Sequence, residues 1–425
     1  MTGSPALGAY LALSAVAEPA ARLILRRRAA RGKEDPARLP ERRGWAGEPR
    51  PEGTLVWLHA ASVGEATSAL PLIDALGAAR PGIWVLLTTG TRTAADLVGA
   101  RLPSFARHQF APVDTRASVR RFLAHWRPDL ALWIESELWP RLIWQTAADG
   151  VPMALVNARI SEQSARRWAR APAMAPALLG RFGLALTQDP ETADRLRALG
   201  MAPEAVREGR SLKSAVLPAE TAAEALSTAE AALAGRPVWL AASTHPGEEA
   251  MAFAAHQAMP EASLLVLAPR HPDRGDEIAG LAEAAGLPHV RRSRGEMPGP
   301  STRVWLADTL GEMGLWYRLA PAAFLGGSLV PMGGHTPFEP AALGAAILHG
   351  PHTENFQPAY GALACAGGAW ALADAAELGP AVAHLLGDPE ARRTMIAAAA
   401  QVRAQQTPDL PALAETLLGL MAGAA

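Results

Sequence analysis

The sequence predicts an α/β protein with two doubly wound, Rossmann-type domains, each built on a parallel sheet with helices on both faces. The first observation is length, because 425 residues exceed what a single ordinary core accommodates. The second is pattern, because short, continuous apolar runs alternate with Ala-rich, helix-like stretches along both halves. Continuous runs are typical of strands buried on both faces, and helical connections between them imply right-handed crossovers. A composition that is 49% hydrophobic and 19% charged is that of a folded globular protein.

The first half supplies the strands of one domain, which we expect over residues 51–210. Each predicted strand is a short apolar run that a helix-like stretch separates from the next. The runs are residues 55–60, 84–89, 108–110, 129–134, 153–157 and 184–187. Ligands of such a sheet bind beyond the carboxyl ends of its strands, so functional residues are expected in the loops that follow them.

The second half repeats this plan and predicts a second domain over residues 237–375. Residues 211–236 are rich in Ala, Glu and Ser and lack a strong strand, so we place an interdomain linker there. Residues 376–425 have a helical pattern and are expected to pack across the hinge. The two domains are expected to face each other across a cleft. The apolar runs of the second domain are residues 238–242, 264–268, 304–307, 322–325 and 345–348.

The first fifty residues predict a segment that associates with a membrane. Residues 6–25 are apolar but include Glu18, Pro19 and Arg22, so the clean run is too short to span a bilayer. They also lack a tidy small-residue cleavage site, and we therefore do not expect a removed signal peptide. Residues 22–50 hold ten Lys or Arg against four Asp or Glu, a local balance of +6. An apolar helix before basic residues favours an anionic membrane surface. The alternative is a packed helix with a solvated basic end.

The overall charge and the cysteine content exclude other classes of partner. The formal net charge is −1, so no global basic field indicates binding to nucleic acid. The single cysteine, Cys365, allows no intramolecular disulfide and makes a Cys/His metal cluster implausible. A reducing compartment suits this composition, and no feature of the sequence sets an oligomeric state.

Residues 326–340 form the most informative stretch of the chain, Gly-Gly-Ser-Leu-Val-Pro-Met-Gly-Gly-His-Thr-Pro-Phe-Glu-Pro. An apolar run leads into the first glycine pair, and an Ala/Leu-rich, helix-like stretch follows. Glycine lets backbone N–H groups approach a ligand closely, and a helix N-terminus favours an anion. A strand, a glycine-rich loop and a helix start, with one His and one Glu on the loop, predict a site for a phosphorylated ligand.

Other strand ends of the second domain extend this prediction. Arg270 and His271 follow the second strand, and residues 308–313 follow the third. Gly350-Pro351-His352 and then Asn355 follow the fifth. A single His is more often structural than functional, but His residues recur at these strand ends. We expect Arg270, His271, backbone amides and hydroxyl groups to converge on a nucleotide phosphate.

Carboxylates mark the strand ends of the first domain. Residues 62–65, Ser-Val-Gly-Glu, follow its first strand and would place Glu65 at the start of a helix. A carboxylate there can cap the helix or act as a general base, and position alone leaves both interpretations open. Glu135 and Glu137 follow the strand at 129–134, where acids can equally decorate a helix start.

Basic residues follow the next strand of the first domain. Asn157 ends the run at 153–157, Arg159 follows it, and Arg166 and Arg167 come shortly afterwards. The arginines could bind an anionic acceptor. For Arg166 and Arg167 we favour a solvated helical face instead.

Taken in order, these motifs resemble the bacterial 3-deoxy-D-manno-octulosonic acid (Kdo) transferases of lipopolysaccharide synthesis. The resemblance rests on the apolar and basic N-terminus and on residues 60–65, 135–140, 157–161, 269–271, 308–313, 326–340 and 350–352. It implies a GT-B fold whose N-terminal domain binds the acceptor and whose C-terminal domain binds CMP-Kdo. It also implies an inverting, metal-independent transfer to a lipid A precursor, without a cofactor, at the cytoplasmic face of the bacterial inner membrane, where the protein is peripheral or N-terminally anchored.

The resemblance also implies roles for individual residues. Glu65 matches the catalytic base, Glu135 or Glu137 matches a second essential acid, and Glu339 would hold the ribose. Ser62, Gly64, Asn157 and Arg159 are the acceptor-side candidates. The donor-side candidates are Arg270, His271, Asp308, Gly311, Glu312, Gly326, Gly327, Ser328, Gly333, Gly334, His335, Thr336, Glu339 and Asn355.

The sequence departs from the family pattern at two places. Thr336 stands where the family usually has Asn, and residues 209–213 read Gly-Arg-Ser-Leu-Lys where it usually has Gly-Asn-Leu-Lys. Two other functions remain as alternatives. One is another nucleotide-sugar glycosyltransferase or an epimerase of the same architecture, and the other is a non-catalytic nucleotide-binding or membrane-scaffolding protein. Carboxylates at Glu65, Glu135 and Glu137 argue against the non-catalytic protein, because a nucleotide binder does not need them.

Overall fold

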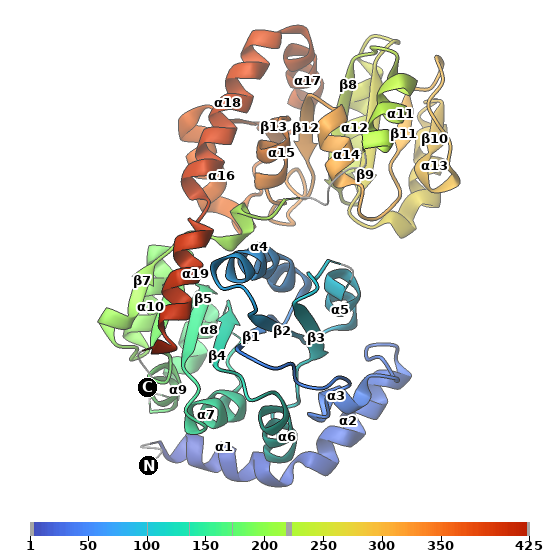
Figure 1. Ribbon diagram of the computed structural model, residues 1–425. Helices are drawn as coiled ribbons and strands as arrows, with labels where there is room; N and C mark the ends of the chain where they lie inside the picture. The colour runs from blue at the N-terminus through green and yellow to red at the C-terminus, as the bar shows by residue number, and fades with distance from the viewer. Residues whose placement is uncertain (1–3, 100, 136, 172, 218–222, 423–425) are drawn as a thin grey trace. The chain divides into compact units, whose positions relative to one another are not determined.

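The computed structural model describes residues 4–99, 101–135, 137–171, 173–217 and 223–422, and these form two compact units (Figure 1). Unit 1 comprises Met1–Val216 together with Thr407–Ala425, and unit 2 comprises Leu217–Gln406. The chain therefore returns to unit 1 at its end. The segment predicted as a linker is divided: residues 212–214 form a 3-10 turn in unit 1, residues 218–222 lie outside the described residues, and α11 (Ala223–Leu233) belongs to unit 2.

Unit 1 contains a seven-stranded parallel sheet in the order β3-β2-β1-β4-β5-β6-β7. Six strands match the predicted runs, and the seventh is a short edge strand that pairs with β6. Because β1 lies between β2 and β4, the chain order reverses there, and the loops after β1 and β4 meet at this switch point. The strands are β1 (Leu55–His59), β2 (Trp84–Thr89), β3 (Ala106–Phe110), β4 (Leu130–Ile134), β5 (Met153–Ala158), β6 (Leu184–Thr187) and β7 (Val206–Glu208).

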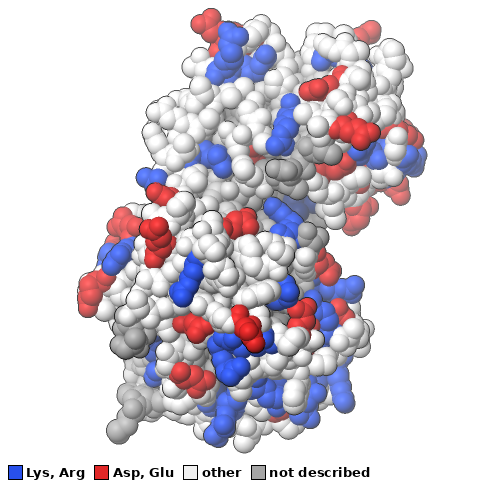
Figure 2. All heavy atoms as spheres, viewed as in Figure 1, with Lys and Arg blue, Asp and Glu red and all other residues white. Residues whose placement is uncertain are grey.

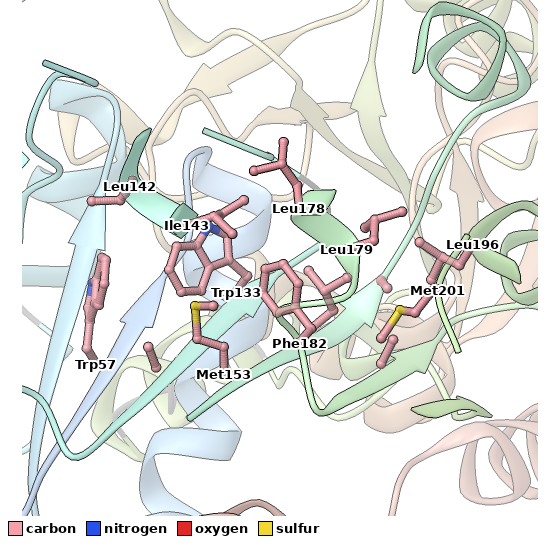
Figure 3. Packing of buried hydrophobic residues seen from close by; sticks show 14 of the residues in the cluster. Trp57, Trp133, Leu142, Ile143, Met153, Leu178, Leu179, Phe182, Leu196 and Met201 are labelled. Atoms are coloured by element: carbon pink, nitrogen blue, oxygen red, sulfur yellow. The ribbon is translucent and has the colours of Figure 1, made fainter. Parts of the chain in front are cut away.

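Helices cover both faces of this sheet because successive strand residues point to opposite faces. Along β1, Trp57 packs into one core with α1, α6, α7, α9 and α10, whereas Leu58 packs into another with α4, α5 and α19. Figure 3 shows the first core, in which the rings of Trp57 and Trp133 lie 4.9 Å apart. The helices are α1 (Pro5–Val16), α2 (Glu18–Ala30), α3 (Leu39–Arg42), α4 (Val63–Ala79), α5 (Arg92–Gly99), α6 (Arg116–Trp126), α7 (Pro140–Ala148), α8 (Glu162–Ala169), α9 (Met174–Leu179), α10 (Pro190–Ala198) and α19 (Leu410–Gly419).

The N-terminal helices belong to unit 1 and are not a separate segment. Leu7 and Leu11 of α1 are buried in the first core, and the Tyr10 hydroxyl donates a 2.7 Å hydrogen bond to Asp114. On the outer side of the same helix, Leu13 and Val16 are 68% and 75% exposed. Helix α1 thus has a packed face, as the prediction of a packed N-terminal helix requires, and an exposed apolar face, as the prediction of a membrane-associating helix requires. No single described helix is long and apolar enough to cross a bilayer; α1 and α2 would reach that length only as a pair bent by 69°.

Unit 2 contains a second seven-stranded parallel sheet, in the order β10-β11-β9-β8-β12-β13-β14. Its switch point lies at β8, between β9 and β12, so the loops after β8 and β12 are neighbours. Three-residue edge strands, β10 and β14, add to the predicted runs. The strands are β8 (Val238–Thr244), β9 (Leu264–Pro269), β10 (His289–Arg291), β11 (Val304–Leu306), β12 (Ala322–Leu325), β13 (Ala346–His349) and β14 (Ala369–Ala371).

Helices also cover both faces of the second sheet. One core involves α11, α14, α15, α16 and α18, and the other involves α12, α13 and α17. Of the helical residues expected after 376, α17 and α18 belong to unit 2, whereas α19 packs against α4 in unit 1. The helices are α12 (Glu248–Gln257), α13 (Gly275–Ala284), α14 (Met313–Leu319), α15 (Phe338–Leu343), α16 (Gln357–Ala366), α17 (Leu378–Gly387) and α18 (Pro389–Gln406).

Candidate active site

Glu65 lies on the first turn of α4, directly after β1, and its side chain caps that helix. Its Oε2 accepts a 2.7 Å hydrogen bond from the Ala61 N–H, and the Ser62 hydroxyl donates to Oε1 at 3.0 Å. Ser62 Oγ in turn accepts from the Glu65 N–H at 3.3 Å. These contacts are those of a capping residue. They also hold the carboxylate in one position at the switch point of the sheet.

The pKa of Glu65 is raised above its ordinary value. Burial is the main cause, and the charge of Glu135 adds to it; hydrogen bonds from Ala61 and Ser62 lower the pKa less, and Glu137 adds a small further rise. A carboxylate with a raised pKa is a stronger base once it is ionised. The capping geometry and a role as general base are therefore compatible in this side chain.

Glu135 follows β4 on the neighbouring strand and forms an ion pair of 2.7 Å with Lys213 Nζ. Its backbone has a φ of 62°, in the left-handed region that residues with side chains rarely adopt. Asn157, at the end of β5, has a φ of 56°. Such strain at neighbouring strand ends is typical of functional sites.

Asn157 is buried and supports the segment that contains Lys213. Its Oδ1 accepts a 2.9 Å hydrogen bond from the Leu212 N–H, and its carbonyl oxygen accepts from Gln188 Nε2 at 2.8 Å. The side chain therefore positions the 3-10 turn at 212–214 and, through it, Lys213. This explains why the unusual stretch at 209–213 still delivers a lysine to Glu135.

Glu137 is held by aromatic side chains. Trp139 Nε1 donates to its Oε2 at 2.9 Å, and His59 Nε2 lies 3.6 Å from the same oxygen. Burial would raise the pKa of Glu137, but the nearby His59, the hydrogen bond from Trp139 and the charge of Arg42 lower it below its ordinary value. Ser136, between the two acids, lies outside the described residues.

A pocket of about 450 Å³ connects Glu137 and His59 with helix α2. Ile24 and Leu25 of α2 line its apolar side, and Arg28 and Arg42 supply positive charge. Apolar side chains beside guanidinium groups are a lining that an amphipathic anion can contact.

The remaining acceptor-side candidates lie at the same edge of the sheet. Ser62 and Gly64 open α4, and Arg159 is exposed just after β5. Arg166 pairs with Glu162 one turn earlier on α8, as expected of a solvated helical face.

In unit 2, the amides of the glycine-rich loop bind a carboxylate of the same chain. Glu248, on the first turn of α12, is fully buried. Its Oε2 accepts from the Gly327 N–H at 2.7 Å, and its Oε1 accepts from the N–H groups of Ser328 and Leu329 at 3.1 and 3.0 Å. The expectation that the amides at 327 and 328 stand free for a phosphate is therefore corrected. The reason is that β8 and β12 are adjacent, which brings α12 under the loop.

Other loop residues also serve the loop itself. The Ser328 hydroxyl donates to the Leu325 carbonyl and accepts from the Gly350 N–H at 2.8 Å. Asn355 Nδ2 donates to the Met332 carbonyl at 3.0 Å, and a Cβ on Gly333, whose φ is 84°, would lie 2.5 Å from that nitrogen. Gly326 packs as tightly against the carbonyl oxygen of Ser243, and Gly334 donates its N–H to the Gly327 carbonyl.

Thr336 accepts a 3.4 Å hydrogen bond from the Phe338 N–H through its hydroxyl, and so begins the turn into α15. Asn can form a similar local turn, so this departure from the family pattern preserves the backbone. Glu339 lies on the first turn of α15.

Three histidines meet beside this loop. His245 and His335 approach each other through their Nε2 atoms at 2.9 Å with nearly parallel rings, and the ring of His271 stands perpendicular to His245 at 6.2 Å. Burial, followed by the charges of His245, Arg270 and His271, lowers the pKa of His335 to about 4. The pair is therefore neutral near pH 7, and Arg270 is the cation that remains for an anionic ligand.

Asp308 and Glu312 are engaged with arginines of the β10 edge. Asp308 Oδ2 pairs with Arg291 Nη2 at 2.7 Å, and Glu312 Oε1 pairs with Arg292 Nη2 at 2.6 Å. Gly311 supplies a φ of 85° between them. These acids organise the third strand end, whereas Arg270, His271 and His335 are brought together at β9 and β12.

Comparison with known proteins shows which family has this arrangement. A family model described as 3-deoxy-D-manno-octulosonic-acid transferase (kdotransferase) matches residues 37–216. A 3-deoxy-D-manno-octulosonic acid transferase of Bordetella pertussis is 40% identical over 85% of this chain and 86% of its own length. One of Haemophilus influenzae is 36% identical over 75% and 76%, and a probable mitochondrial one of Arabidopsis thaliana is 35% identical over 82% and 80%.

The chain belongs to the Kdo transferase family. Solved structures show the fold alone. The UDP-GlcNAc 2-epimerase of Neisseria meningitidis, bound to UDP-GlcNAc, covers 86% of this Kdo transferase and all of its own chain with a TM-score of 0.54 at 13% identity. A putative epimerase of Listeria monocytogenes gives 0.53 at 15% identity, over 87% of this chain and 95% of its own. The fold is GT-B-like, with two doubly wound α/β units. The epimerase alternative thus shares the architecture, but the family does not support it.

Four side chains that contact the candidate residues were not among the predicted ones. Lys213 and His59 contact the strand-end acids of unit 1, and His245 and Glu248 contact the glycine-rich loop of unit 2. His59 is the last residue of its strand, and His245 and Glu248 follow theirs, so the sequence could have indicated these three as strand-end residues. The residues that they contact lie far away in the chain, so the contacts themselves could not be predicted.

Proposed function

We propose that this Kdo transferase moves Kdo from CMP-Kdo to a lipid A precursor in lipopolysaccharide biosynthesis, by an inverting displacement that uses no metal ion or other cofactor. The observation on which the proposal rests is the fixed, partly buried carboxylate of Glu65 beside Glu135. A hydroxyl nucleophile needs a base with a raised pKa held in one place, and Glu65 meets both conditions.

The transfer is a single displacement. Glu65 takes the proton of the acceptor hydroxyl as the hydroxyl oxygen bonds to the anomeric carbon of Kdo. The bond from that carbon to the CMP phosphate breaks on the opposite face, and CMP leaves with the electron pair. A positioned carboxylate accelerates such a step by roughly 10²–10⁴-fold.

The donor is proposed to bind unit 2 beside Arg270 and the three histidines. Arg270 stabilises the charge that develops on the leaving phosphate, since a guanidinium forms strong hydrogen bonds to phosphate oxygens. His245 and His335, kept neutral by burial and by neighbouring positive charge, offer ring nitrogens to the donor without adding charge. Glu248 acts indirectly as a positioning residue, because it fixes the loop that contains Ser328 and His335.

Among the residues that the structure describes, no group of three His, Cys, Asp or Glu side chains is arranged to hold a metal ion. We propose that Arg270 takes the role that a cation has in other glycosyltransferases. The metal-free character remains part of the proposal.

Unit 1 is proposed to attach to the anionic cytoplasmic face of the bacterial inner membrane. Leu13 and Val16 of α1, and Leu23 and Ile24 of α2, expose apolar side chains, with Ile24 at 55%. Figure 2 shows Lys and Arg gathered over the part of unit 1 that α1, α2 and α6 form. Apolar side chains next to basic ones suit an interfacial helix pair.

The direct test is an assay of the purified protein with CMP-Kdo and a defined lipid A precursor in detergent. We expect CMP to be released and the acceptor to gain the mass of one or more Kdo units. Release of CMP without a heavier acceptor would contradict transfer. Stabilisation by UDP but not by CMP in a thermal-shift assay would instead favour a transferase for another nucleotide sugar.

A further inference from the structure

Unit 1 has a second hollow, outside the acceptor-side site. It is a groove of about 830 Å³ between helices α1, α6 and α7, on the sheet face opposite α4 and α5. None of the strand-end acids lines it. The groove therefore needs an explanation other than Kdo transfer itself.

The charge of the groove is strongly one-sided. Four arginines line it, namely Arg116, Arg120, Arg127 and Arg141, against one acid, Asp149. Asp149 already accepts a 2.8 Å hydrogen bond from Gln145. In the described part of the chain, no carboxylate forms an ion pair with Arg116, Arg120 or Arg127.

The positions of these arginines are unfavourable for the stability of the protein alone. Arg116 and Arg120 are one turn apart on α6, a spacing at which like charges destabilise a helix. Burial lowers the pKa of Arg141, Asp114 raises it, and the charge of Arg116 lowers it further. Arg127 has a φ of 40°, in the left-handed region, at the end of the same helix. Four positive charges gathered against a single acid in the groove lining indicate an anionic ligand.

The floor of the groove is apolar and formed largely by small side chains. Ala12 and Ala15 of α1 and Ala124 of α6 leave space that larger residues would fill. Leu11 and Leu123 line the same floor. Leu13 and Val16, the exposed residues of α1, are next in sequence to the alanines, so the groove adjoins the face expected to meet the membrane.

We propose that this groove binds one molecule of an anionic glycerophospholipid. Its phosphate would lie between Arg116 and Arg120, where guanidinium groups donate hydrogen bonds to phosphate oxygens. One acyl chain would cover the alanine floor and continue towards the bilayer. The inference rests on the proposed attachment of unit 1 to an anionic membrane, and it adds a specific lipid site to that surface.

Native mass spectrometry of the full chain in detergent, with added phosphatidylglycerol or phosphatidylcholine, tests the proposal. The wild type should retain phosphatidylglycerol and not phosphatidylcholine. R116A/R120A should reduce that retention about tenfold or more, because both phosphate contacts are lost. The control R80A/R92A removes the same charge from exposed positions at the end of α4 and the start of α5, on the other face of the sheet, and should retain the lipid.

A second variant separates a lipid from a free anion. A124W keeps the charge but fills the floor, so it should also lose phosphatidylglycerol. If R116A/R120A retained the lipid as the wild type does, or if both lipids were retained equally, the site would not exist. If A124W retained the lipid and millimolar inorganic phosphate displaced it from the wild type, the groove would be a phosphate site and not a lipid site.

The same preparations separate this inference from the proposed function. In detergent with CMP-Kdo and acceptor, R116A/R120A should release CMP at the wild-type rate, because the groove does not include the strand-end acids. A wild type that releases no CMP contradicts the proposed function, whatever its lipid retention. A wild type that transfers Kdo but binds no phospholipid contradicts the groove alone.

Discussion

The buried carboxylate of Glu248 accepts a 2.7 Å hydrogen bond from the backbone N–H of Gly327. Together with its contacts to Ser328, Leu329 and His245, this gives one fully buried side chain four backbone donors. A row of amides that a glycine-rich loop would offer to a phosphate is thus filled from within the protein. The loop is therefore held in place by the protein itself, and in the proposed complex the donor phosphate must rely on other groups.

Replacing Glu248 with Gln should destabilise unit 2. The amide turns an NH₂ group towards backbone donors and leaves at least one of them buried without a partner, which costs about 2–4 kcal/mol. Urea denaturation followed by tryptophan fluorescence measures this. The control E283Q, on the exposed side of α13, should change stability by less than about 0.5 kcal/mol. Equal midpoints for E248Q and the wild type would show that the carboxylate does not organise the loop.

Replacing Glu65 with Gln should leave the fold intact and lower kcat for CMP release roughly 10²–10⁴-fold. The amide retains the shape and can still accept a hydrogen bond from the Ala61 N–H, but it cannot take a proton. The control is E191Q, since Glu191 is an acid on the first turn of the helix α10 and is exposed. Near wild-type turnover in E65Q would remove Glu65 as the base.

The pH dependence of transfer should report the surroundings of Glu65. Because burial and then Glu135 raise the pKa of Glu65, kcat/KM should rise with pH and reach half its maximum above the ordinary value of 4.5. Lys213→Met leaves the charge of Glu135 uncompensated and should move this midpoint to higher pH, whereas Glu135→Gln should move it lower. Arg80→Met, at the far end of α4, should leave it unchanged. Shifts of Lys213→Met and Glu135→Gln in the same direction would contradict this electrostatic link.

The histidine pair of unit 2 should make the free energy of unfolding depend on pH. The pKa of His335 is about 4 in the folded protein, below its ordinary 6.5, so the unfolded chain binds more protons between these values. Its contribution to stability is therefore complete above about pH 6.5 and is lost as the pH falls towards 4. The replacement H335Q should reduce the loss of stability between pH 7 and pH 4 by ~1–3 kcal/mol, measured as urea midpoints at each pH. An unchanged pH dependence in H335Q would show that His335 is not held neutral.

Removal of divalent metal ions should not slow transfer. After dialysis against EDTA, the rate of CMP release should stay within about twofold of the untreated rate, since no Lewis acid is proposed to act on the leaving phosphate. Loss of activity that Mg²⁺ or Mn²⁺ restores would replace Arg270 with a metal ion in this role.

The sequence predicted most of the sheet strands because they are continuous apolar runs. It did not predict the edge strands β7, β10 and β14, because each is only three residues long. In addition, most residues of β7 and β14 are exposed, so these two strands have no continuous apolar run. It placed Glu65 at a helix start, where the structure has it. It could not find the partners of Asp308 and Glu312, because Arg291 and Arg292 lie on or beside one of those edge strands. Nor could it find Glu248 under the glycine-rich loop, since that contact depends on the pairing of β8 with β12.

Helix α19 has a consequence for how the protein is made. Ala414 and Leu417 of α19 fill the same core as α4, the helix that begins with the Glu65 turn, although the whole of unit 2 separates them in the chain. Domains usually fold in the order in which the ribosome delivers them. Here the half that is synthesised first lacks part of its core until α19 has been translated, after the whole of unit 2. Unit 2 can therefore fold first, and the helix that begins with the Glu65 turn can pack fully only after α19 has been made.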